Sequence, residues 1–514
     1  MNGDDVGQPD GAAAQPAGAE VEHRQRPTSA AFRRFIADGW QPRPPGRPST
    51  LPAARYAAAR RDRLSAAFPG QRLVVPAGTL RTRSNDTDHR FRPHSAFAHL
   101  TGLGTDQEPD AVLVLEPRRG PGEDGHQAVL YFRPRADRDT EEFYANARYG
   151  ELWVGVRPSL DEIAAMTGLD CRHLDEVDEA VAKDVGDGEQ GGVLVRLVRG
   201  ADGRLEAHLV EVRTAAGCQD EQLTSQDAEL TRAVSELRLI KDEYEIEQLR
   251  LACELTARGF TDIVRALPEA IIGSRGERVV ETAFESRARR EGNGVGYDTI
   301  AAAGEHACTL HWIGNDGAVR DGDLVLVDAG AELDSLYTAD ITRTLPVSGS
   351  FSDAQLQVYQ AVLDAADAAF GVARPGSRFR DLHEAAMKVI AARLHEWGLL
   401  PAGVSVEQTL DQEGQFHRRW MVHGTSHHLG LDVHDCSQAR KEMYLDAELE
   451  PGMVFTIEPG LYFRAEDELV PQRLRGIGVR IEDDVLVTED GCVNLSGSLP
   501  RQPVEIEAWM ASLR

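Results

Sequence analysis

Acidic side chains end or interrupt several apolar, strand-like segments in the second half of this chain. Asp328 ends the run LVLVD, Glu458 ends VFTIE and Glu482 ends VRIE, while Asp340 lies within TADIT. Burying an ionised carboxylate is costly unless it is paired, protonated or bound to metal. One such residue alone is best interpreted as a salt-bridged core acid. Four of them, with His427 and further histidines in the same half, favour a metal site.

The chemistry of these five side chains indicates which metal they would bind. Four carboxylates and one imidazole form a hard, oxygen-dominated ligand set, which suits Mn2+ better than a structural zinc site. Four negative charges also match two divalent cations, which shared carboxylates can hold roughly 3.5–4 Å apart. We therefore expect two divalent metal ions, with Mn2+ favoured and Co2+, Fe2+ or Zn2+ as alternatives. The signatures HExxH, GxSxG and GxxxxGK[ST] do not occur.

Composition and pattern change along the chain and predict three regions. Residues 1–50 are rich in Ala, Pro, Gly and Arg, which predicts a flexible tail. Residues 51–235 predict a non-catalytic α/β domain, with strands over 111–117 and 127–134 and a helix over 159–166.

A long helical pattern around 227–267 marks the next boundary, and residues 236–514 form the predicted catalytic domain. Strands are expected there over 323–330, 336–347 and 478–488. The predicted fold class is α/β (α+β), with the catalytic domain preceded by a smaller α/β domain.

Charge and cysteine usage exclude several classes of protein. The formal net charge of -28 argues against nucleic acid or an anionic membrane as a partner. Six scattered cysteines without a CxxC motif indicate reduced thiols and no disulfide framework. The first residues lack the apolar stretch of a signal peptide, and no apolar run approaches the roughly 18 residues of a membrane span. We therefore expect a cytoplasmic protein with no nucleic-acid or membrane partner.

Longer motifs make the second half resemble the pita-bread metallopeptidases and, among them, aminopeptidase P. The first half is similar to the non-catalytic domain of that family, through FAHLTGL at 97–103 and SELRLIKDEYEIEQLR at 235–250. The matching segments of the second half are YDTIAAAGEHACTLHW (297–312), VDAGAELDSLYTADITRTLPVSG (327–349), HGTSHHLGLDVHD (423–435), LEPGMVFTIEPGLY (449–462) and GVRIEDD (478–484).

Two departures from the family pattern stand out. Eleven residues separate Asp328 from Asp340, where the family usually has ten. We expect the extra residue at a hairpin tip around 333–335, where insertions are tolerated, and the rival is that Asp334 displaces a ligand. His428 occupies a position where the family commonly has a bulky aromatic residue, and alternation along a strand would point it away from His427.

The resemblance implies a role for each metal-site residue. Asp328 would chelate one ion, and Asp340 and Glu482 would bridge both. His427 and Glu458 would complete the shell of one ion. Glu458 would also take the proton of the attacking water as general base and return it as general acid.

Four further residues match family positions near the substrate. His423 and His434 would flank the peptide and stabilise the developing oxyanion or line the proline pocket, and His311 would form the opposite wall. Arg480, two residues before Glu482 and predicted to lie on the same strand face, would orient an acidic ligand.

The implied activity is metal-dependent hydrolysis of the N-terminal Xaa-Pro bond, in which a water held between two cations releases the first amino acid. The alternative is a prolidase, which shares all five ligands but takes Xaa-Pro dipeptides. A non-catalytic peptide-binding module is a third reading, although such relatives usually lose metal ligands. The family also implies a homo-oligomer, a dimer or a tetramer.

Overall fold

The structure is a computed structural model of the 514-residue chain and describes residues 27, 29–43, 48–119, 124–186 and 192–513. The chain divides into two compact units. The first comprises Met1–Gly46 and Pro134–Ser159, and the second comprises Arg47–Arg133 and Leu160–Arg514.

The described residues of the first unit form the short helices α1 (Ala30–Ala37), α4 (Glu141–Ala145) and α5 (Glu151–Val154). The Ser29 hydroxyl accepts the Phe32 N–H at 3.1 Å and caps α1. The Phe32 ring packs edge-on against Tyr144 at 5.3 Å. Part of the predicted tail is therefore helical. Residues 1–26, 28 and 44–47 of that segment lie outside the described residues.

A mixed five-stranded sheet with the order β6-β5-β4-β1-β7 organises the first half of the second unit. Its strands are β1 (Arg72–Pro76), β4 (Val112–Pro117), β5 (His126–Phe132), β6 (Asp170–His173) and β7 (Val195–Leu197). Strands β1, β4 and β5 pair antiparallel, and β6 and β7 add in parallel at the two edges. The predicted strands over 111–117 and 127–134 are confirmed as β4 and β5.

Apolar side chains of this sheet alternate between two cores. Leu73 and Val75 pack into one cluster and Val74 into the other, as the period of two requires. The predicted helix over 159–166 is confirmed as α6. The elements around the sheet are α2 (Ala54–Ala67), β2 (Thr82–Ser84), β3 (Thr87–Asp88), α3 (Ser95–Thr101), α6 (Leu160–Thr167), α7 (Val177–Ala182) and α8 (Gly203–Ala215).

The helical pattern around 227–267 is two helices, α9 (Asp220–Glu236) and α10 (Glu243–Ala270), so the prediction of one continuous pattern is wrong at 237–242. Asp242 accepts the Glu245 N–H and Glu245 accepts the Asp242 N–H, both at 3.1 Å. This reciprocal capping box starts a new helix although the apolar periodicity runs on.

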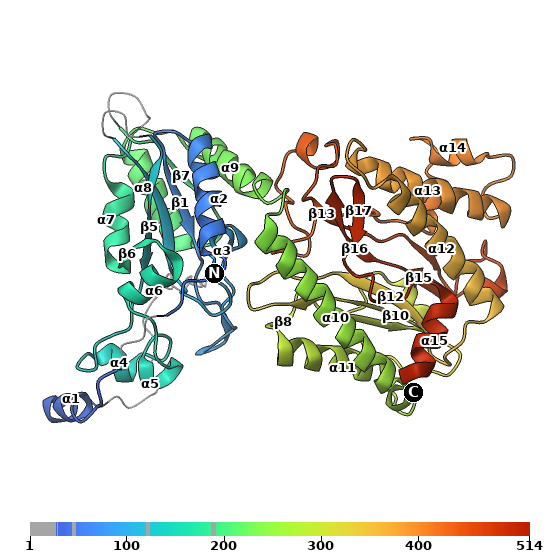
Figure 1. The fold of residues 1–514 in the computed structure, drawn as a ribbon, viewed down its shortest axis with the longest axis horizontal. Coiled ribbons are helices and arrows are strands. Elements are labelled where there is room, and N and C mark those ends of the chain that lie inside the picture. The colour runs from blue at the N-terminus through green and yellow to red at the C-terminus, as the bar shows by residue number, and fades with distance from the viewer. Residues whose placement is uncertain (1–26, 28, 44–47, 120–123, 187–191, 514) are drawn as a thin grey trace, which may run out of the picture. The chain divides into compact units, whose positions relative to one another are not determined.

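In the second half of the second unit, small antiparallel sheets surround one hydrophobic core. Helices α10 and α11 pack side by side, as do α12 and α13 (Figure 1). The sheet order is β12-β10-β9 in one sheet and β13-β16-β17 in another, with the pairs β14-β15 and β11-β8 beside them. The strands are β8 (Gly294–Val295), β9 (Ile300–Ala303), β10 (Leu324–Ala329), β11 (Ala331–Glu332), β12 (Ile341–Pro346), β13 (Val454–Ile457), β14 (Gly460–Phe463), β15 (Ile477–Arg480), β16 (Asp483–Thr488) and β17 (Gly491–Asn494). The helices are α11 (Gly276–Glu291), α12 (Asp353–Val372), α13 (Phe379–Glu396), α14 (Val406–Leu410) and α15 (Pro503–Leu513).

Two predicted strands of this half are shorter or divided. The strand expected over 336–347 is ordered as β12 only from Ile341. The segment 478–488 forms two strands, β15 and β16, which belong to different sheets and meet at Ile481 and Glu482. Arg480 and Glu482 therefore do not share a strand face, and that prediction is wrong.

No helix among the described residues is long and apolar enough to cross a membrane.

Candidate metal centre

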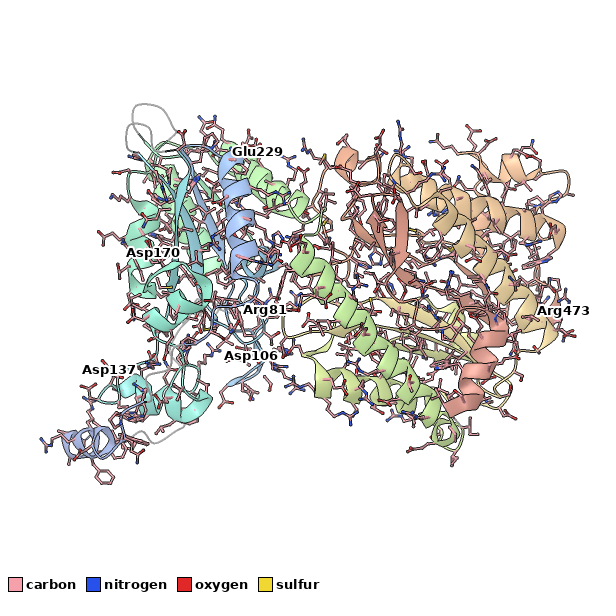
Figure 2. The ribbon with its side chains drawn as sticks, viewed as in Figure 1. Arg81, Asp106, Asp137, Asp170, Glu229 and Arg473 are labelled. Atoms are coloured by element: carbon pink, nitrogen blue, oxygen red, sulfur yellow. The ribbon has the colours of Figure 1, made fainter. Side chains whose placement is uncertain are left out.

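A cavity of about 530 Å³ brings the predicted site residues together. Its lining includes all nine of them: Asp328, Asp340, His427, Glu458, Glu482, His311, His423, His434 and Arg480. A larger cavity of about 720 Å³, lined in part by Arg81 (Figure 2), Arg92 and Arg238, contains none of them. The residues that the sequence predicts to bind metal or to act in catalysis therefore all line the smaller cavity.

Strand ends place the acidic residues in this cavity. Asp328 is the penultimate residue of β10, and Asp340 directly precedes β12, which pairs antiparallel with β10. Glu458 directly follows β13, and Glu482 directly precedes β16, its antiparallel partner. Three of the four carboxylates thus lie just beyond a strand, whereas the sequence suggested positions within strands. Because these acidic residues lie at strand ends, their side chains do not pack into the apolar layers of the sheets and can approach one another in the cavity.

Asp340, His427 and Glu482 form one compact group of possible ligands, whose ligand atoms lie within 4.8 Å of one another. Nε2 of His427 lies 3.3 Å from Asp340 Oδ2 and 3.5 Å from Glu458 Oε1. Its Nδ1 lies 3.3 Å from the His428 carbonyl oxygen. A proton on Nδ1 donated to that carbonyl leaves the Nε2 lone pair facing the carboxylates, as metal ligation requires.

Three side chains hold the outer oxygens of the acidic group. The Tyr297 hydroxyl donates to Asp328 Oδ1 at 2.7 Å and also contacts Asp340 Oδ1. The Arg480 guanidinium forms a buried ion pair with Asp328 Oδ2. The Thr342 hydroxyl donates to Glu482 Oε2 at 2.6 Å. Partners of this kind fix the orientation of metal ligands.

Sequence reasoning missed Tyr297 and Thr342. Tyr297 begins the family-like segment 297–312, and Thr342 lies two residues after Asp340. Their positions within these motifs could have identified them as site residues.

Burial and mutual repulsion act on the acidic group. Burial, followed by the charge of Asp328, raises the pKa of the Asp340 carboxyl. Burial also raises the pKa of Glu458 to about 7, and burial with the charge of Asp340 raises that of Glu482 well above its usual range. Carboxylates that oppose one another's ionisation in a buried site are stabilised by cations. Two divalent ions therefore fit this donor set.

The neighbouring histidines are neutral donors or acceptors at the cavity wall. His423 Nε2 lies 2.7 Å from the Tyr462 hydroxyl, and its Nδ1 lies 3.5 Å from Glu458 Oε2. Burial, with the Arg480 charge, lowers the pKa of His423 to about 3. His434 packs edge-on against His427 with ring centroids 4.5 Å apart, and burial lowers its pKa. Tyr462 also contacts Arg480 at 3.2 Å and was not predicted from the sequence.

His428 does not line the cavity. Its ring stacks on Phe379 with centroids 4.8 Å apart and meets Tyr444 edge-on at 4.6 Å. Both ring nitrogens are buried, and neither makes a well-aligned hydrogen bond among the described residues, although the Val454 carbonyl lies near the ring. His427 and His428 do face different environments. They lie outside the named strands, but His428 forms an antiparallel bridge with Phe455, and the Thr456 N–H donates to the His427 carbonyl at 2.9 Å, so the segment runs alongside β13 as a strand would.

The extra residue between Asp328 and Asp340 lies in a tight turn. The Leu336 N–H donates to the Leu333 carbonyl at 2.8 Å, and the Leu333 N–H donates to the Tyr337 carbonyl at 3.0 Å. Asp334 lies in this turn and is absent from the cavity lining. The turn therefore accommodates the insertion, and the rival placement of Asp334 as a ligand finds no support.

Comparison with known proteins matches both halves of the chain. Residues 247–489 match metallopeptidase family M24, and residues 57–193 match the aminopeptidase P N-terminal domain. Xaa-Pro aminopeptidase 1 of Streptomyces coelicolor is 50% identical over 461 residues, covering 90% of this chain and 88% of the relative. The Xaa-Pro aminopeptidase of Escherichia coli is 34% identical over 455 residues, covering 87% of this chain and 95% of the relative.

Solved structures match over the same extent. Aminopeptidase P from E. coli with the inhibitor Pro-Leu superimposes with a TM-score of 0.75 at 31% identity, covering 90% of this chain and 100% of that chain. Pseudomonas aeruginosa aminopeptidase PepP gives a TM-score of 0.74 at 32% identity, covering 90% of this chain and 99% of that chain. The likeness therefore extends over both the sheet of the first half and the half that carries the cavity.

Proposed function

Because the chain belongs to the Xaa-Pro aminopeptidases of metallopeptidase family M24, we propose that the cavity between Asp328, Glu458 and His434 is its catalytic centre. The fold is the pita-bread fold of that family, preceded by its N-terminal domain. The enzyme is a metal-dependent hydrolase that removes the first amino acid from peptides with proline second. The convergence of nine side chains on one cavity carries the assignment of the site.

We assign the binding of two divalent ions to five residues, which together would hold both ions: Asp328, Asp340, His427, Glu458 and Glu482. When bound, the two cations supply Lewis-acid polarisation of the scissile carbonyl and acidify an attacking water. The oxygen-rich ligand set favours Mn2+ over Zn2+.

Glu458 is placed to move the proton of the reaction. One of its oxygens faces His427 at 3.5 Å and the other faces His423 at the same distance, so the carboxylate lies between the ligand histidine and the cavity wall. It accepts the proton of the attacking water and returns it to the proline nitrogen that leaves.

His423, His434 and His311 act on the substrate. Neutral His434 presents a ring N–H group to the carbonyl oxygen on which negative charge develops. The Nδ1–H of neutral His423 donates to the Gly424 carbonyl at 2.6 Å and its Nε2 faces the Tyr462 hydroxyl, so His423 lines the pocket for the peptide. His311 lies on the wall that also includes the apolar side chains Leu310 and Ile313, which suit a proline ring. Arg480 does not touch the substrate in this assignment, because its guanidinium is paired with Asp328.

Product analysis by mass spectrometry tests this function. Mn2+-loaded protein is incubated with Xaa-Pro, Xaa-Pro-Yaa and Xaa-Ala-Yaa peptides of matched composition. We expect loss of one residue from Xaa-Pro-Yaa, with the dipeptide and the alanine peptide intact. Cleavage of the dipeptide alone would make the protein a prolidase. No cleavage of any peptide by metal-loaded protein would favour a binding module.

We also propose that the enzyme is a cytoplasmic homo-oligomer. The apolar residues Leu152, Trp153 and Val154 of α5 are each about half exposed, which is typical of surfaces that pair. Light scattering coupled to size exclusion measures the oligomeric state, and a monomer at micromolar concentration would contradict the assembly.

A further inference from the structure

A buried carboxylate outside the metal centre organises the cavity wall that carries His311. Glu277 lies in the first turn of α11 and is fully buried. The hydrogen-bond partners of its side chain among the described residues all lie within 303–317, the segment that leads from the end of β9 toward β10. Three residues of this segment, Leu310, His311 and Ile313, line the catalytic cavity.

Both oxygens of Glu277 are saturated. Oε1 accepts the Ala303 N–H at 2.8 Å and lies 2.7 Å from His306 Nδ1. Oε2 accepts the Trp312 Nε1–H at 2.8 Å and the Gly317 N–H at 2.6 Å. The backbone N–H of Glu277 donates in turn to the Gly317 carbonyl at 3.1 Å. An ionised carboxylate offers about four acceptor positions, and this one uses four.

The surrounding geometry fits this one carboxylate closely. The His306 and Trp312 rings stack with centroids 4.0 Å apart, which brings their two donors to the same acceptor group. A Cβ on Gly317 would lie 2.6 Å from Glu277 Oε2, so only glycine allows this approach. The segment is thus tied at its beginning, near its middle and at its end.

We propose that Glu277 is a positioning residue for catalysis, because it fixes the wall segment 310–313 against the substrate. The proposal rests on the role assigned above to His311. No hydrogen bond among the described residues joins Glu277 to a candidate metal ligand, so its effect on the reaction passes through the wall and not through the metal ions.

Replacing Glu277 with Gln removes two of the four acceptor positions. The amide keeps one oxygen and places an NH2 group against two N–H donors, so the wall loses its anchor. Displacement of a positioning group by about 1 Å can cost about 100-fold in rate. We therefore expect E277Q to lower kcat/KM for an Xaa-Pro-Yaa peptide by about 10- to 100-fold, with metal content unchanged.

A double-mutant cycle separates positioning from general damage. E277Q, H311A and the double variant are compared in kcat/KM, metal content and melting temperature. If Glu277 acts through the wall, the double variant is no slower than H311A alone. The matched control is E281Q, one turn later on α11, which removes the same charge and leaves the bonds to 303–317 intact. E281Q should retain wild-type kcat/KM.

The proposal would be overturned by wild-type kcat/KM in E277Q, by losses that add fully in the double variant, or by loss of bound metal from E277Q. Full activity of H311A beside an impaired E277Q would also reject it, while leaving the peptidase activity itself established. Should E277Q fail to fold, W312F replaces it in the cycle. W312F removes one hydrogen-bond donor to Glu277 and keeps an aromatic ring, so we expect a smaller loss of kcat/KM than in E277Q. This loss should also disappear when W312F is combined with H311A.

Discussion

Asp340 is held at the metal centre through both its side chain and its backbone. Its carboxylate faces His427 and Tyr297, and its backbone N–H donates to Asp484 Oδ2 at 3.0 Å. The side chain is thus held from two sides while one carboxylate edge stays directed at the cavity. Residues of this kind should affect metal binding and turnover together.

We predict that Asp340→Ala loses bound metal and lowers kcat/KM by more than about 100-fold, because the remaining ligands cannot hold both ions. Metal content by mass spectrometry and peptide turnover measure the two effects. The metal-free variant should be no less stable than metal-free wild type, since one repelling carboxylate is gone. Turnover close to wild type would show that the ligand assignment is wrong.

His434 should separate metal binding from catalysis. Its ring packs against His427 without lying in the tight ligand group. We predict that His434→Ala retains its metal ions and loses about 100-fold in kcat, the scale for removing one oxyanion donor. Loss of metal in this variant would instead make His434 a ligand.

His428 offers a test of stability. Among the described residues its two buried nitrogens make no well-aligned hydrogen bond, and an unsatisfied buried polar group costs about 1–3 kcal/mol. His428→Phe, in a pocket formed by Phe379, Tyr444 and Phe455, should therefore raise the free energy of unfolding by about 1–2 kcal/mol and preserve activity.

The same substitution should change the response to acid. Burial lowers the pKa of His428 from 6.5 to about 3, so the unfolded chain takes up this proton first as the pH falls. Wild type then loses stability between pH 6.5 and 3, and the Phe variant loses less. Urea unfolding at pH 7 and pH 5 measures the difference, and an equal loss in both proteins would contradict the prediction.

At the scale of elements, the site depends on how closely β10 approaches the start of β12. Gly330 follows β10, and a Cβ there would lie 1.8 Å from the Ala339 carbonyl oxygen and 2.9 Å from the Tyr297 ring. This approach sets the distance between Asp328 and Asp340. Side-chain substitution at Gly330 should therefore disturb both carboxylates and Tyr297 at once.

We predict that Gly330→Ala costs about 1–3 kcal/mol of stability and weakens metal binding, because the added methyl group forces the two strands apart. The control is Gly371→Ala in α12, where a Cβ meets nothing within 4 Å. That change should be neutral or slightly stabilising. Equal behaviour of the two variants in metal titration and thermal unfolding would refute the argument.

At the scale of the whole molecule, metal binding and folding are coupled. Ligands that bind only the native state stabilise it, by about 2.7 kcal/mol at 100 times the dissociation constant. Without metal ions the carboxylates of the acidic group repel one another, and the Arg480 ion pair with Asp328 relieves this repulsion only in part, on a chain with a formal net charge of -28. Removing the metal ions with a chelator should therefore lower the melting temperature of the protein, and adding Mn2+ should restore it.

This stabilisation should depend on pH. Burial raises the pKa of the Glu458 carboxyl from 4.5 to about 7. As the pH falls, the metal-free native state therefore takes up a proton at Glu458 before the unfolded chain does. Its destabilising effect is complete above pH 7 and is relieved as the pH falls toward 4.5. We predict that the melting-temperature difference between loaded and chelated protein is larger at pH 8 than at pH 5.5. A difference that is constant with pH would contradict this.

Local sequence was enough to predict the acidic residues that line the cavity, and several elements. The four carboxylates were recognised because each stands beside an apolar run, and β4, β5 and α6 follow patterns of neighbouring residues. The whole-chain likeness to Xaa-Pro aminopeptidases bears out the fold class and the activity implied by the motifs.

Tertiary structure alone decided how the site is held. The partners Thr342 and Glu482 are 140 residues apart, and Arg480 and Asp328 are 152 apart, so no periodicity could reveal them. The breaks before α10 and between β15 and β16 were hidden because the apolar pattern continues through them. Glu277 gave no signal, since its four donors come together only when 303–317 folds over α11. Sequence patterns report neighbours along the chain, whereas orientation, hydrogen bonding and electrostatic coupling arise between distant segments that only packing brings into contact.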